Sequence, residues 1–121
     1  MPRPKKYRRV CGPPCHEVFG PQGAAGTPAG VDMSLDEYET IRLIDLLGQT
    51  QEECARQMEV ARTTVQAMYD SARKKLADAL VNGRNLYIRG GAVRICPHGD
   101  RCAGGPGCRH RPCMKHENGK D

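Results

Sequence analysis

The sequence has few aromatic residues and no long apolar run. It contains one phenylalanine, four tyrosines and no tryptophan in 121 residues. No stretch approaches the roughly 20 consecutive apolar residues of a transmembrane helix. No apolar segment follows the basic start, as it would in a secretory signal peptide. We therefore expect a cytoplasmic protein that does not have a membrane as its partner.

The sequence also lacks the patterns by which common enzymes are recognised. It has no glycine-rich loop that would cradle a phosphate, no catalytic triad and no pair of acids placed for acid–base chemistry. We therefore expect that the protein is not an enzyme.

Glycine and proline, 14 and 9 residues respectively, lie mostly outside the middle of the chain. Because both weaken regular helices, only the middle is expected to form a compact core. Four segments are expected: a basic arm and linker at 1–30, a helical domain at 31–81, a short β-hairpin around a Gly-Gly pair at 82–95, and a Cys/His-rich tail at 96–121.

Two capping boxes predict the starts of the first two helices. In "SLDE" the Ser34 hydroxyl can accept from the Glu37 backbone N–H while the Glu37 side chain reaches back. Gly48 is a natural end for this helix. "TQEE", starting at Thr50, repeats the pattern and opens a helix of about two turns, which is too short to be stable without packing.

The third helix is predicted from Arg62 to about Leu80. An Asn-Gly pair at 82–83 ends it. Two features weaken the turn before it: Glu59 stands where such a turn usually needs glycine, and Ala61 has no side chain that could cap a helix. The apolar stripe of the helix consists of Val65, Met68, Ala72, Leu76 and Ala79.

The spacing of the second and third helices predicts a helix-turn-helix. The small side chain of Ala55 would let the two helices cross closely, and Cys54 would be a small core residue beside it. In this motif the start of the third helix enters the DNA major groove. The expected fold class is mainly α: a three-helix helix-turn-helix core with a short β-hairpin and irregular Cys-rich tails.

Polar side chains of suitable chemistry occupy the DNA-facing positions of this motif. Arginine can pair with guanine, glutamine with adenine, and threonine with a base edge or a phosphate. The start of the second helix would meet a phosphate through its N–H groups, and the basic arm would enter the minor groove or follow phosphates. The predicted DNA-binding residues are Thr50, Gln51, Arg62, Thr63, Thr64, Gln66, Arg73, Lys74, Lys5, Lys6, Arg8 and Arg9.

The charge distribution agrees with double-stranded DNA as partner. Residues 1–30 contain five lysines and arginines against one acid, residues 31–81 contain six against ten, and residues 82–121 contain eight against three. Basic ends around a mildly acidic middle favour an anionic polymer. Charge alone agrees equally well with solvated, soluble tails.

One long string and three short ones carry a family resemblance. They are "DEYETIRLIDLLGQTQEECARQMEVARTTVQAMYDSARKKLADAL", "RRVC", "FGP" and the "GG" after the third helix. Over most of residues 2–96 they resemble domain-of-unknown-function family 134, whose members are predicted DNA-binding proteins and often have glycine in place of Glu59. The helix-turn-helix is also similar to the promoter-binding fourth region of bacterial sigma factors. That resemblance implies groove contacts by Arg62, Thr63 and Gln66.

Six of the seven cysteines lie in the two tails. In a reducing compartment such clusters bind metal more often than they form disulfides. Zinc comes first, with an iron–sulfur cluster as the alternative. Either both tails share one metal, or the C-terminal cysteines form their own site, or the tails carry free thiols. The candidate ligands are Cys11, Cys15, Cys96, Cys102, Cys108 and Cys113.

Two functions agree with these patterns. The leading one is a sequence-specific DNA-binding protein, a transcriptional regulator that reads the major groove with helix 62–80. The alternative is a metal- or redox-handling protein whose helical domain binds a protein partner. Because helix-turn-helix proteins often act in pairs, a homodimer is one expected arrangement, joined through the long third helix or the cysteine region.

Overall fold

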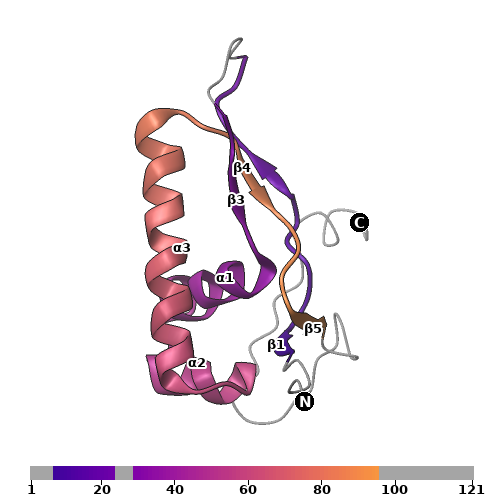
Figure 1. The fold of residues 1–121 in the computed structure, drawn as a ribbon, viewed down its shortest axis with the longest axis vertical. Coiled ribbons are helices and arrows are strands. Elements are labelled where there is room, and N and C mark those ends of the chain that lie inside the picture. The colour runs from indigo at the N-terminus through magenta and orange to yellow at the C-terminus, as the bar shows by residue number, and fades with distance from the viewer. Residues whose placement is uncertain (1–6, 24–28, 96–121) are drawn as a thin grey trace, which may run out of the picture.

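The computed structural model describes residues 7–23 and 29–95. Its longest element is α3 (Arg62–Asn82), which runs along one side of the molecule (Figure 1). Helices α1 (Leu35–Thr40) and α2 (Gln51–Met58) pack against α3, and so do strands β3 (Val31–Met33) and β4 (Leu86–Ile88). Figure 1 shows α2 at the start of α3, and β3 and β4 toward its other end.

The first helical segment begins and ends where the sequence predicts. The Ser34 Oγ accepts from the Glu37 N–H at 3.4 Å, and the Glu37 side chain accepts from the Ser34 N–H at 3.0 Å. After α1 the chain continues as a π-helix, η1 (Ile41–Leu46). The turns of a π-helix are wider than those of an α-helix, and the sequence predicts one α-helix over the whole segment. Gly48 follows with φ of 78°. The capping signals therefore predict the ends of this segment but not its change of type.

The second and third helices also have the predicted ends. Thr50 and Glu53 form the expected capping box, with contacts of 3.1 and 2.9 Å. Glu59 has φ of 62°, the left-handed conformation that costs a non-glycine residue about 1 kcal/mol. Ala61 precedes α3 without a side-chain cap, and Gly83 ends α3 with φ of 66°.

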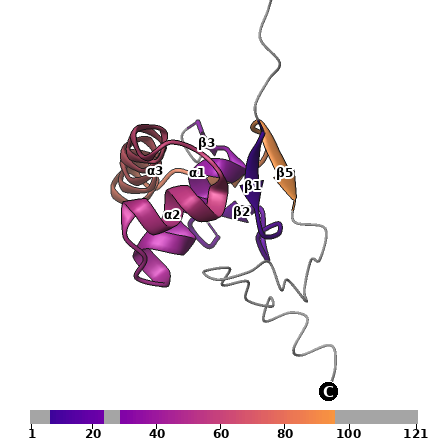
Figure 2. The same ribbon diagram turned by 90° about the horizontal axis from the view of Figure 1, so that it is seen from below.

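Two small sheets join distant parts of the chain. Strand β1 (Arg8–Val10) pairs in parallel with β5 (Val93–Ile95). Strand β2 (Val18–Phe19) pairs antiparallel with β4, and β3 pairs in parallel with β4, so β4 is the middle of three strands. Figure 2 shows β1 between the helices and β5.

These pairings correct two expectations. Both strands expected at 82–95 are present, but they pair with N-terminal strands in two separate sheets, and not with each other as a hairpin. The segment 1–30 is not only an arm and linker, because it contains β1 and β2, and β3 then opens the segment expected to be helical. Strands of two or three residues are held mainly by their partners, and the periodicity of such short segments does not identify partners far away in the chain.

The buried core has two parts, and α3 contributes to both. One part lies between η1, α2 and the start of α3, and the other between α1, the second half of α3 and the strands β3 and β4. The first contains Leu43, Cys54, Ala55, Met58, Val65 and Met68, and the second contains Met33, Ala72, Leu86 and Ile88. The predicted core residues of α2 and the first half of α3 are thus confirmed, while Leu76 and Ala79 are half-buried.

Candidate nucleic-acid interface

Helices α2 and α3 are joined by three residues and pack on each other. Cys54, Ala55 and Met58 of α2 meet Val65 and Met68 of α3 in the first part of the core. Ala55 has the smallest side chain in this cluster and lets the two backbones approach closely. The burial of Val65 and Met68 fixes which side of α3 faces inward, so the other sides of its first turns face outward.

The first turns of α3 present the predicted groove residues to solvent. Arg62, Thr63 and Gln66 are exposed, and Thr64 is half-buried. With 3.6 residues per turn, Arg62 and Gln66 lie one turn apart on the same face. No described part of the chain covers the three exposed side chains.

Arg62 is held by the start of α2. Its Nη1 donates to the Gln51 Oε1 at 3.0 Å, and its Nε lies 4.0 Å from the Glu52 carboxylate. The structure thus brings together two predicted DNA-binding residues, Gln51 and Arg62, from different helices. Both contacts are at the surface, where an ion pair contributes about 0–1 kcal/mol, so a stronger partner can replace them.

Thr50 caps α2 in addition to its predicted contact with a phosphate. Its hydroxyl oxygen accepts from the Glu53 N–H, so this oxygen already serves the capping box. The hydroxyl hydrogen can still donate to a phosphate. The N–H groups of Gln51 and Glu52, at the first two helical positions, have no partner within the helix itself. The start of α2 therefore keeps donors for an anion, beside two exposed acids, Glu52 and Glu53.

Arg73 and Lys74 lie three turns beyond the start of α3. Arg73 is 3.9 Å from the Asp45 carboxylate and stacks on the Tyr69 ring at 5.3 Å. The Tyr69 hydroxyl donates to Asp45 at 2.7 Å, and this bond raises the pKa of Tyr69. Arg73 is about 16 Å from Arg62 along the helix axis, too far to share one base pair with it. Lys74 is exposed on a different face.

Two of the four basic residues predicted for the N-terminal arm belong to a strand of the fold. Arg8 and Arg9 belong to β1, and the Arg8 guanidinium lies 3.6 Å from the Asp36 carboxylate of α1. Arg8 therefore contributes to the packing of β1 on α1, and its contact with DNA stays a prediction. Lys5 and Lys6 lie outside the described residues.

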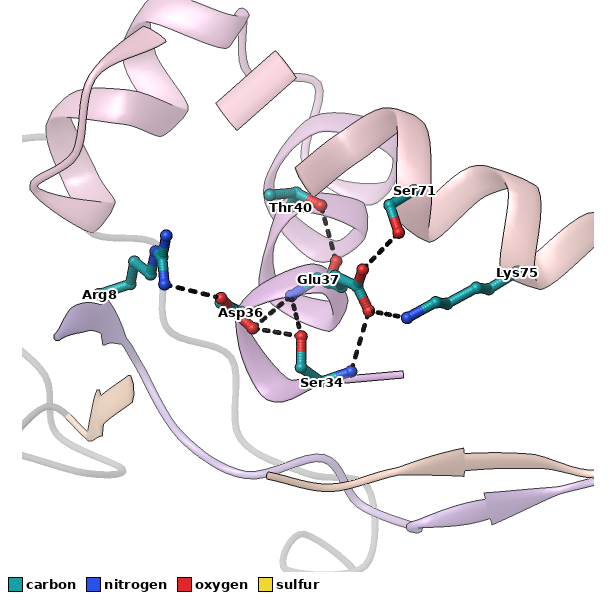
Figure 3. Close-up of polar contacts among 7 residues, drawn as sticks. All are labelled: Arg8, Ser34, Asp36, Glu37, Thr40, Ser71 and Lys75. Atoms are coloured by element: carbon teal, nitrogen blue, oxygen red, sulfur yellow. Dashed lines mark hydrogen bonds and ion pairs between the residues drawn. The ribbon is translucent and has the colours of Figure 1, made fainter. Parts of the chain in front are cut away.

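Three acids on α1 are buried, which sequence reasoning missed. The capping box at Ser34 predicts a role for Glu37 at the start of the helix, but it predicts no contact of these acids with another element. Glu37 accepts from Lys75 at 2.8 Å and from Ser71 at 2.5 Å, both on α3, while Asp36 contacts Arg8 of β1 (Figure 3). Burial raises the pKa of the Glu37 carboxyl, but hydrogen bonds from Lys75, Ser71 and the Ser34 N–H outweigh burial and hold the pKa below its ordinary value.

Glu39, the third of these acids, is fully buried. Its two oxygens accept from the Arg42 Nε and Nη2, each at 2.9 Å, and one oxygen also accepts from the Cys11 N–H at 3.2 Å. Burial lowers the pKa of the Arg42 guanidinium, yet the Glu39 carboxylate raises it overall. The acids of α1 thus fix this helix to α3 and to β1. Their partners lie on other elements, so no local sequence pattern identifies them.

The described cysteines are placed very differently. Cys54 is fully buried as predicted, and burial raises the pKa of its thiol to about 12. Cys11 is also buried, and its Sγ accepts from the Gln57 side chain of α2 at 3.3 Å. Cys15 is half-buried. Within 7–23 and 29–95 no group of three or more His, Cys, Asp or Glu side chains could hold a metal ion. The remaining four candidates, Cys96, Cys102, Cys108 and Cys113, lie outside this part of the chain.

Comparison with known proteins assigns a family to this chain. The model of the family described as "Protein of unknown function DUF134" matches residues 1–96. The chain belongs to this family. The UPF0251 protein of Desulfitobacterium hafniense (strain DSM 10664 / DCB-2) is 54% identical over 127 residues, which cover 100% of both chains.

Two further UPF0251 proteins match at lower identity. The UPF0251 protein of Caldanaerobacter subterraneus is 43% identical over 112 residues, covering 92% of this chain and 93% of the relative. That of Chlorobaculum tepidum is 44% identical over 113 residues, covering 92% of this chain and 56% of its own length. No solved structure matches this chain. Within the described part of the chain, no helix is long and apolar enough to cross a membrane.

Proposed function

We propose that this protein binds double-stranded DNA in a sequence-specific way and acts as a transcriptional regulator. In this proposal α2, the turn and α3 form a helix-turn-helix similar to the fourth region of bacterial sigma factors, and the start of α3 enters the major groove. The observation that carries the proposal is the exposure of Arg62, Thr63 and Gln66 on α3, directly after the turn.

The chemistry of these side chains suits base edges. Arg62 would donate two hydrogen bonds to guanine O6 and N7, and Gln66 would pair with N6 and N7 of adenine. Arg62 would first leave Gln51 and Glu52. Because these surface contacts are weak, a bidentate pair with guanine outweighs them. Gln51, released from Arg62, would then be available to a phosphate at the start of α2.

Selection of bound sequences from a random duplex pool tests the proposal with the full chain. The expected result is a shared sequence motif. Arg62→Ala and Gln66→Ala should each relax the preference at one position, with a loss of about 5- to 150-fold in discrimination there. Arg84→Gln, at the far end of α3, is the matched control and should select the wild-type motif. A pool without any shared motif, or an unchanged motif in both variants, contradicts the proposal.

A further inference from the structure

A small ribbon of two strands stands beside the turn that precedes α3. This ribbon is the parallel pair β1–β5, and β1 packs against α1 and α2. Figure 2 shows β5 on the outer side of β1, away from the helices. The ribbon therefore has one strand fixed to the helical core and one strand at its free edge.

The two faces of the ribbon differ in character. Side chains alternate between faces along a strand, and residues that are register partners project on the same face. Val10 is fully buried and Arg8 contacts Asp36, so their face is turned to the core. Arg9 and Arg94 are register partners and belong to the other face. The face turned away from the core therefore carries two arginine side chains.

Glu59 locates this face relative to α3. The Arg94 guanidinium forms an ion pair with the Glu59 carboxylate, and the two side chains are 49% and 53% exposed. Glu59 lies three residues before Arg62, which limits the separation of their Cα atoms to about 11 Å. Arg94 therefore stands at the entrance to the proposed recognition helix, already bound to a carboxylate at that point.

We propose that the β1–β5 ribbon is a second DNA-binding element, in which Arg94 leaves Glu59 and binds a backbone phosphate next to the groove entered by α3. This inference rests on the proposed function. The exchange costs little free energy, because a half-exposed ion pair contributes about 0–1 kcal/mol. A phosphate contact, in contrast, also releases a condensed counterion. The contact adds affinity and carries no sequence information.

A salt titration of DNA binding tests the contact of Arg94. Arg94→Gln should lower the steepness of log K against log salt by about 0.9 and weaken binding roughly 3- to 10-fold at low salt, equally on preferred and random duplexes. Arg84→Gln, which removes the same charge at the opposite end of α3, should leave the slope unchanged. Equal slopes for Arg94→Gln and wild type overturn the inference.

A double-mutant cycle tests the exchange itself. Glu59→Gln keeps the size of the side chain and the left-handed backbone but removes the competing carboxylate. If Arg94 moves from Glu59 to a phosphate, Glu59→Gln strengthens binding more in the wild-type background than in the Arg94→Gln background. An equal gain in both backgrounds reports only the lost negative charge and overturns the exchange.

The two proposals fail in different ways. If the wild-type protein does not bind duplex DNA at low salt, the proposed function is wrong. If it binds and Arg62→Ala alters its sequence preference, while Arg94→Gln behaves like Arg84→Gln, only the ribbon inference is wrong. Thermal unfolding of each variant, compared with wild type, separates a lost contact from a lost fold.

Discussion

Lys75 of α3 donates to the Glu37 carboxylate of α1 across 2.8 Å, although the two residues are 38 positions apart in the chain. Ser71, one turn earlier on α3, donates to the other oxygen of the same carboxylate. These bonds anchor α1 to the middle of α3 and leave the first turn of α3 uncovered. The contacts that anchor α1 and the proposed DNA-contacting residues thus lie on different turns of α3.

Glu37→Gln should weaken the fold and flatten its dependence on acid pH. The folded-state pKa of Glu37 lies below the unfolded value of about 4.5, so its contribution is complete above that pH and is lost as pH falls through the folded pKa. At pH 7 the variant should lose about 1–3 kcal/mol, the usual value of hydrogen bonds to a charged group.

Urea unfolding at pH 7 and at several steps down to pH 3 measures both effects. Glu52→Gln, an exposed acid on α2, is the control and should keep the wild-type pH profile. A Glu37→Gln variant that loses stability as steeply as wild type below pH 4.5 would show that another group causes the acid sensitivity.

Ala55→Leu should destabilise the packing of α2 on α3. The larger side chain has no room in the first part of the core, and overpacking costs about 1–3 kcal/mol. Ala67→Leu makes the same change at an exposed position of α3 and should stay within about 0.5 kcal/mol of wild type. Urea unfolding compares the two, and equal stabilities would contradict a close crossing at Ala55.

Gly83→Ala should cost about 1 kcal/mol of unfolding free energy. Gly83 ends α3 with φ of 66°, and a Cβ there would meet no atom within 4 Å, so the whole effect is backbone strain. A thermal unfolding curve measures the loss. An unchanged midpoint would mean that the chain leaves α3 in another conformation.

The Cys54 thiol should resist alkylation while the protein is folded. Its pKa of about 12 leaves almost no thiolate at pH 8, and the side chain is fully buried. Iodoacetamide treatment followed by mass spectrometry of the peptide should find Cys54 unlabelled in buffer and labelled in urea. Labelling of Cys54 in buffer at the rate seen in urea would contradict its core position.

Metal binding by the tail cysteines stays a prediction, and elemental analysis of the purified full chain measures it. Zinc should be present at about one ion per chain, whereas iron with visible absorbance would indicate a cluster. Replacing Cys102 and Cys108 by serine should lower the metal content, and Cys54→Ala should not. A wild-type chain free of zinc and iron would leave the tails without the predicted site.

Local signals predicted the helices well. Capping boxes at Ser34 and Thr50 and the glycines at 48 and 83 act within one turn of the chain, so a single sequence contains them in full. The exposure of the predicted groove residues is also a local property, because the apolar stripe that α3 buries determines which sides of the helix face outward.

Long-range contacts were not predicted. The strands have two or three residues, and their register depends on partners far away in the chain, such as Arg8 opposite Val93. The Arg94–Glu59 contact, which carries the ribbon inference, depends on that register. The burial of Asp36 and Glu39 likewise depends on partners from β1 or the residue after it, which no local pattern identifies.

The pairing of β1 with β5 has a consequence for biosynthesis. Strand β1 cannot complete its pairing until residue 95 has been translated, because Val10 is opposite Ile95. The capped helices, whose contacts are closer in sequence, can assemble earlier. Nascent chains stalled before residue 93 should therefore expose β1 to chaperones and proteases, because its partner strand has not yet been made.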